Sequence, residues 1–157
     1  MDIKEHTKPK NLLKYAFMWN QIRLVIAAAS LILGGFPVVL RIFSSSSSMV
    51  SSLLTVSWII SGLAAAYLFY LWIKGGKKLW GGTDNVDMAA FAIAIISGLH
   101  LGIAGVLGTN IGMSVVPSGL FTLVMLIAGA LYLWSAFHLH NRYRADSNMF
   151  GVKAKVE

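Results

Sequence analysis

The sequence predicts an all-α membrane protein, a bundle of four transmembrane helices with both termini in the cytoplasm. The first observation behind this prediction is composition. Of 157 residues, 57% are hydrophobic and only 12% are charged, whereas a soluble domain carries roughly 25% charged residues. The second is that the charges are clumped and leave gaps of 17, 32 and 54 residues without any charge. The third is that Lys and Arg gather in alternate connecting segments.

The three charge-free gaps predict the number of spans. Crossing ~30 Å of hydrocarbon takes about 20 mostly apolar residues, so the gaps hold one, one and two spans. We predict a single membrane domain over residues 1–157, with short basic tails at 1–14 and 141–157. The spans are predicted at about residues 22–43, 52–73, 87–109 and 117–138.

Local signals indicate where these helices bend, begin and end. Pro37 should kink the outer half of the first span, because proline removes a backbone hydrogen bond, and the serine run 44–48 should follow as a polar loop. Asp84 is a good N-cap for the third span, and Asp87 in the first turn suits the positive end of the helix dipole. Pro117 favours the first turn of the fourth span.

The distribution of Lys and Arg predicts the orientation. Five lie in the N-terminal region up to Arg23, three lie between residues 74 and 78, four lie in the C-terminal tail, and Arg41 is alone. Because a four-span chain alternates sides, twelve of the 13 basic residues fall on one side, which the positive-inside rule assigns to the cytoplasm. We expect an integral protein of the cell (plasma) membrane.

The net charge of +7 does not indicate a nucleic-acid partner, because the placement of Lys and Arg on the cytoplasmic side of the membrane accounts for it. The basic face also suits the anionic headgroups of the lipid bilayer. The alternative interpretation is that it docks an acidic cytoplasmic protein.

Two absences from the sequence exclude familiar chemistry. The chain has no cysteine, which excludes disulfides, thiolate metal sites and iron–sulfur clusters. None of its carboxylates lies at mid-membrane, and the nearest, Asp87, is at the inner boundary of the third span. This counts against coupled transport through an embedded acid, paired-carboxylate catalysis and a carboxylate-bridged metal centre. The six acidic residues are Asp2, Glu5, Asp84, Asp87, Asp146 and Glu157.

The third predicted span carries small residues at helical spacing. Small side chains let helix backbones approach closely, which supplies packing energy where the hydrophobic effect cannot. The pattern does not separate packing within the chain from packing against another subunit. The predicted helix-packing residues are Ala90, Ala94, Gly98, Gly102 and Gly105.

His100 is the titratable side chain that the sequence places deep in a span. Counting ~1.5 Å per residue from Met88 puts it roughly 18 Å into the membrane. One interpretation is a cofactor site, with His100 as an axial ligand to haem or as a hydrogen-bond donor to a quinone. The other is a neutral histidine that a neighbouring polar group satisfies without any cofactor. His138 and His140 lie at the inner end of the fourth span, where with Asn141 and Arg142 they are interpreted as an interfacial cap.

These observations leave three hypotheses for function. The first is a non-catalytic structural or accessory subunit that packs through its third helix into a larger membrane complex or a homo-oligomer. The second is a haem- or quinone-binding membrane subunit of a respiratory-type redox complex that uses His100. The third is a small-solute channel or carrier, with a path lined by Ser57, Ser61, Ser97, His100 and Thr122. No catalytic residue and no metal site is predicted.

Overall fold

The computed structural model describes residues 7–34, 48–108 and 115–151. In these ranges the chain forms helices and no strands, and each of the four long helices is long and apolar enough to cross a membrane. This confirms the predicted all-α fold. The helices are α2 (Pro9–Ile32), α4 (Ser48–Lys74), α5 (Asn85–Leu107) and α7 (Phe121–Ala145), with a short 3-10 helix, η1 (Ser118–Leu120), before α7.

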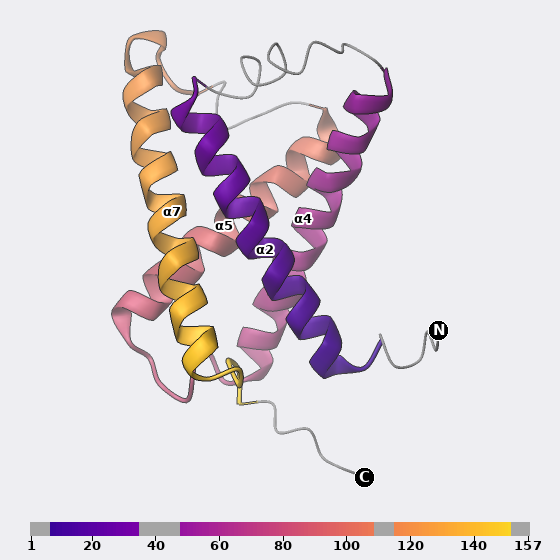
Figure 1. Ribbon diagram of the computed structural model, residues 1–157, viewed down its shortest axis with the longest axis vertical. Helices are drawn as coiled ribbons and strands as arrows, with labels where there is room; N and C mark the ends of the chain where they lie inside the picture. The colour runs from indigo at the N-terminus through magenta and orange to yellow at the C-terminus, as the bar shows by residue number, and fades with distance from the viewer. Residues whose placement is uncertain (1–6, 35–47, 109–114, 152–157) are drawn as a thin grey trace.

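Successive long helices run in opposite directions, and α2 crosses in front of α5 (Figure 1). The most extensive contacts join α4 to α5 and α2 to α7. One end of the bundle holds the start of α2, the connection between α4 and α5, and the end of α7 (Figure 1). We call it the basic end, because Lys74, Lys77, Lys78, Arg142 and Arg144 lie there.

The first helix, α2, begins at Pro9, in the first-turn position that proline favours, and ends at Ile32, whereas the first span was predicted at 22–43. Residues 35–43 of that prediction lie outside the described residues. The prediction treated Arg23 as the boundary of an apolar segment. The structure instead buries Arg23 inside the bundle, where α5 supplies two of its hydrogen-bond partners. The predicted kink at Pro37 and residues 44–47 of the serine run fall outside the described residues.

Helices α4 and α5 begin and end within a turn or so of the predicted positions, whereas α7 ends seven residues beyond the predicted end of the fourth span. The Asp84 carboxylate accepts hydrogen bonds from the backbone N–H groups of Val86 and Asp87 at 2.9 and 3.0 Å, so it caps α5 as predicted. Gly108 ends α5 in the left-handed conformation, with φ 69°. Pro117 precedes η1, so α7 itself begins a turn later than the predicted fourth span.

The chain beyond residue 141 is more ordered than a basic tail. Helix α7 continues to Ala145, and the next residues fold back so that Met149 and Phe150 are buried under the basic end. Trp80 holds this segment, because its backbone N–H donates to the carbonyl of Met149 and its ring Nε1 donates to the carbonyl of Asp146, at 2.8 and 2.6 Å. Apolar residues therefore close the basic end of the bundle.

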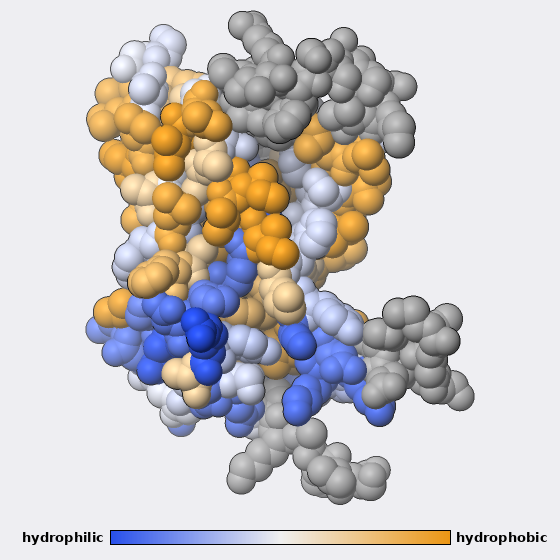
Figure 2. Space-filling view, viewed as in Figure 1, coloured by the Kyte–Doolittle hydropathy of each residue, from blue (hydrophilic) through white to orange (hydrophobic). Residues whose placement is uncertain are grey.

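The surface divides along the long axis of the molecule. Hydrophilic residues gather at the basic end, and hydrophobic residues cover most of the visible face beyond it (Figure 2). Large apolar side chains remain exposed on all four long helices, including Ile26, Leu63, Ile96 and Phe137. An apolar belt of this kind fits a lipid environment better than water.

Candidate functional site

A buried arginine lies at the centre of the bundle. Only 7% of Arg23 is exposed, and its guanidinium donates to Ser97 Oγ from Nη1 at 3.0 Å, and to the carbonyl of Ala94 from Nη2 at 2.8 Å. Nη2 also donates to Asn20 Oδ1, which comes from the preceding turn of α2. All three acceptors are neutral oxygen atoms. We call Arg23, Asn20 and Ser97 the central cluster.

Contacts around the central cluster bring in the two remaining helices. Tyr132 on α7 is close enough to interact electrostatically with Arg23. On the α4 side, Trp19 Nε1 donates to Ser61 Oγ at 3.0 Å. The central cluster therefore joins α2 to α5 and lies beside contacts that reach α4 and α7.

A second polar cluster lies at the basic end, between the first turn of α5 and the last turns of α7. Asp87 is only 3% exposed, and its Oδ1 lies 2.6 Å from His138 Nε2. Arg142 donates to the same carboxylate from Nη2 at 2.8 Å and from Nε at 3.1 Å to each oxygen. We call Asp87, His138 and Arg142 the basic-end cluster.

The sequence folds into this arrangement for simple reasons. His138 and Arg142 are four residues apart, so they share one face of α7 and reach the same carboxylate. An acid in the first turn of α5 and a base in the last turn of α7 each suit their own helix dipole. Because the two helices are antiparallel, these favourable charges also meet each other.

Neighbouring groups extend the basic-end cluster. The guanidinium of Arg142 lies over the ring of Trp80, 5.2 Å from its centroid, and the ring of His138 stacks on Trp134. The pKa of Asp84 is lowered from its ordinary value of 3.8, mainly because its carboxylate accepts backbone hydrogen bonds from Asp87 and Val86, and further because Arg142 and His138 are near. Arg142 thus pairs with the carboxylate of Asp87, lies near that of Asp84 and makes a cation–π contact with Trp80.

The predicted small-residue stripe of α5 contacts other helices of the same chain. Its first part, Ala90 and Ala94, is fully buried, and its backbone carbonyls accept hydrogen bonds from Ser135 Oγ at 2.7 Å and from Arg23. Its glycines face α4. A Cβ built on Gly98 would lie 2.6 Å from the Cβ of Ala65, and one built on Gly102 would lie 2.6 Å from the Cα of Gly62.

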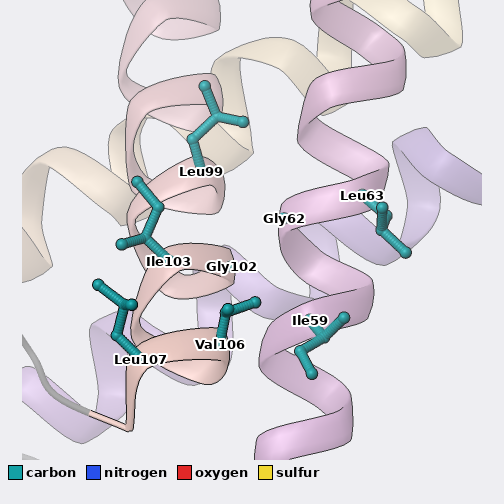
Figure 3. A pocket seen from close by; sticks show the side chains of 8 residues that line it. All are labelled: Ile59, Gly62, Leu63, Leu99, Gly102, Ile103, Val106 and Leu107. Atoms are coloured by element: carbon teal, nitrogen blue, oxygen red, sulfur yellow. The ribbon is translucent and has the colours of Figure 1, made fainter.

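Gly105 completes this contact, since a Cβ there would meet Trp58 and Ile59 of α4 at 3.0–3.1 Å. Next to the Gly62–Gly102 crossing, an open apolar groove of about 370 Å³ runs between α4 and α5 (Figure 3). Its walls are aliphatic and carry no polar side chain. They are Ile59, Gly62, Leu63, Leu99, Gly102, Ile103, Val106 and Leu107.

His100 is half-buried on α5, about one turn beyond Ser97 toward the far end of the bundle, which is the end opposite the basic end. Among the described residues, no group of three or more His, Cys, Asp or Glu side chains could hold a metal ion. The residues predicted to line a solute path do not lie in one place. Ser61 and Ser97 are buried and hydrogen-bonded, whereas Thr122 is exposed on the outside of α7.

Sequence reasoning missed both polar clusters. His100 was predicted to be the deep titratable residue, but Arg23 is also deep, and its burial is more complete. The available signal was the run Asn20-Gln21 followed by Arg23, which is unusual inside an apolar helix. His138 and Arg142 were interpreted as an interfacial cap, whereas they bind Asp87 of another helix.

Comparisons with protein-family models, with curated proteins and with solved structures found no match to this chain.

Proposed function

We propose that the chain is a non-catalytic membrane protein, a structural or accessory subunit of a larger membrane complex or of a homo-oligomer. The observation that carries this proposal is how the buried polar side chains are used. Arg23 joins α2 to α5, Trp19 joins α2 to α4, and Ser135 and Asp87 join α5 to α7. Groups that bind each other in this way fix the positions of the helices, which is a structural use of buried polar side chains.

The outer surface supports the second half of the proposal. The small-residue stripe of α5 is covered by other helices of the same chain, so a partner would contact the exposed apolar faces of the bundle. Phe137 on α7 is 70% exposed, although a phenylalanine is costly to leave in water. In a membrane this face meets either lipid or the apolar helix of another subunit.

Photo-crosslinking distinguishes these two occupants. A benzophenone amino acid in place of Phe137 should crosslink the chain to another protein or to a second copy in native membranes. The matched control is the same amino acid in place of Phe91, which is 4% exposed and should crosslink within the chain. Crosslinks to lipid alone from position 137, together with a monomer mass near 17.0 kDa in native nanodiscs, would contradict a subunit role.

We also propose that the basic end faces the cytoplasm and that the membrane is the plasma membrane. Eight Lys and Arg residues of the described chain lie at or near the basic end, around the start of α2, at the end of α4 and in its connection to α5, and at the end of α7. This asymmetry supports the orientation by the positive-inside rule, even though Arg23 no longer counts toward it.

The absence of cysteine from the chain makes the orientation easy to test. Single cysteines in place of Ser147, at the basic end, and Ser118, at the far end, are both exposed. In intact cells a membrane-impermeant maleimide should label the cysteine at 118 and spare the one at 147. The reverse pattern would invert the orientation, and labelling of both would contradict the spanning model.

A further inference from the structure

Charge at the basic end is divided unevenly between two sides of the bundle. The start of α2 and the end of α4 form one side, and the start of α5 and the end of α7 form the other, because α2 packs on α4 and α5 packs on α7. Hydrophilic residues cover the start of α2 in Figure 2. On the first side the described chain carries six lysines and no acid. We call it the lysine face, and its residues are Lys8, Lys10, Lys14, Lys74, Lys77 and Lys78.

The opposite side is balanced. Its charged residues in the described chain are Arg142, Arg144, Asp84, Asp87 and Asp146. Both ion pairs between described residues lie on this side. The full sequence is divided in the same way: residues 1–14 and 74–78 carry seven Lys and two acids. Residues 84–87 and 142–157 carry four Lys or Arg and four acids. The excess positive charge of the basic end therefore belongs to the lysine face.

The helix dipole of α2 adds to this excess. Acids are favourable in the first turn of a helix, where the dipole is positive. The first turn of α2 holds no acid, and no side chain caps its N-terminus, yet Lys8 and Lys10 lie there. All six lysines are exposed. An anion from outside the chain would relieve the repulsion on this face.

The lysine face lies at the border of the apolar belt. Leu12 and Tyr15 remain exposed among the lysines of α2, and Ile73 is exposed next to Lys74. The ammonium of Lys74 lies over the ring of Tyr70, 5.9 Å from its centroid. Lysines mixed with exposed aromatic and aliphatic side chains are typical of segments at a membrane interface. This places the excess charge at the level of lipid headgroups.

We propose that the lysine face binds the headgroups of phospholipids that carry a net negative charge. Lysine suits this partner, because its ammonium is a strongly hydrated point charge on a long apolar stem that can lie along the belt. An acidic protein would be bound better by arginine, whose planar guanidinium pairs with carboxylates, and both arginines of the basic end lie on the balanced side. The lipid preference and the proposed subunit role can each hold without the other.

Native mass spectrometry of the purified full chain in a neutral detergent tests this preference. The chain is given equal concentrations of phosphatidylglycerol, which is anionic, and phosphatidylcholine, which has no net charge, with identical acyl chains. One lysine near a headgroup favours an anionic lipid by about fivefold. We therefore expect the chain to retain phosphatidylglycerol at least about fivefold better than phosphatidylcholine. Equal retention of the two lipids would overturn the proposal.

Matched variants assign the preference to the lysine face. The neutralised variant combines Lys10→Gln, Lys14→Gln and Lys74→Gln. The control removes the same charge from the end of the chain and combines Arg144→Gln, Lys153→Gln and Lys155→Gln. The neutralised variant should bind the two lipids almost equally, whereas the control should keep the wild-type preference. Arginine at the three lysine positions should also keep it, because the charge is unchanged. The replaced lysines are exposed, so these variants should fold, which Tm in the same detergent verifies.

Two outcomes would contradict the assigned surface. The first is a wild-type lipid preference in the folded neutralised variant, or an equal loss of preference in the control. The second is a protein partner: equal binding of the two lipids, together with an acidic protein that co-purifies with wild type from native membranes and is lost from the neutralised variant.

Discussion

The two polar clusters of this bundle each contain a buried guanidinium or carboxylate, but they differ in how charge is balanced. At the basic end, Asp87 is matched by Arg142 and His138, and Arg142 remains 47% exposed to solvent. At the centre, Arg23 is 7% exposed and its acceptors are all neutral. The first cluster is a complete ion pair near water, and the second is a buried cation that the described chain does not neutralise.

This difference shows that the burial of a charged side chain and its contribution to the stability of the fold are separate properties. Breaking a balanced buried pair leaves one charge without a partner, which is strongly unfavourable. Removing an unbalanced charge leaves only neutral groups, and these can bond elsewhere: Ser97 Oγ already lies 3.2 Å from the carbonyl of Ala94. We therefore expect Arg23, although it is more deeply buried, to contribute less to the free energy of unfolding than Arg142.

The largest effect is expected from Arg142→Met. Methionine keeps the length and apolar stem but leaves the carboxylate of Asp87 buried with only His138 as partner. We expect a loss of about 3 kcal/mol, or about 6–12 °C in Tm for a chain of this size. Thermal unfolding in detergent checks it. Arg144→Met, at an exposed position two residues further on, is the control and should unfold close to wild type.

A smaller loss is expected from Ser135→Ala, which removes the neutral hydrogen bond between the two clusters. Ser135 is fully buried, and its hydroxyl donates to the carbonyl of Ala90 at 2.7 Å. Losing one such bond should cost about 1 kcal/mol, because the carbonyl that is left already serves the helix. A loss as large as that of Arg142→Met would show that ion pairing is not what distinguishes the basic end.

The smallest effect is expected at the exposed cap of α5, and it depends on pH. The pKa of Asp84 is lowered below 3.8 by backbone hydrogen bonds, so its contribution to stability is complete above that value and is lost as the pH falls through the lowered pKa. Asp84→Ala should therefore lower Tm at pH 7, and its difference from wild type should shrink as the pH falls below 3.8. A difference that persists unchanged at low pH would show that the charge of Asp84 is irrelevant.

The comparison also shows what could be read from the sequence. The charge-free gaps predicted four long apolar helices, because charged residues are costly in lipid and are therefore rare in membrane-spanning segments. Asp84 was identified as a cap because capping is local, needing only the two residues that follow. Both properties depend on nearby residues or on simple counts.

The sites were harder to predict because their partners lie far apart in the chain. Asp87 and Arg142 are separated by 55 residues, and Arg23 and Ser97 by 74. Treating every arginine as a boundary moved the first span to 22–43 and hid the central cluster, whereas the helix ends at Ile32. The spacing of Ser135, His138 and Arg142 along one face of α7 was a usable signal.

The balance of charge in the two clusters is tested most directly by comparing Arg23→Met with Arg142→Met. Both would be unfolded thermally in the same neutral detergent and the same buffer. Arg142→Met should lose about 6–12 °C, whereas Arg23→Met should stay within about 2 °C of wild type or unfold at a higher temperature. Equal losses in the two variants would contradict the account, because they would mean that the neutral oxygens around Arg23 balance its charge as well as Asp87 balances Arg142.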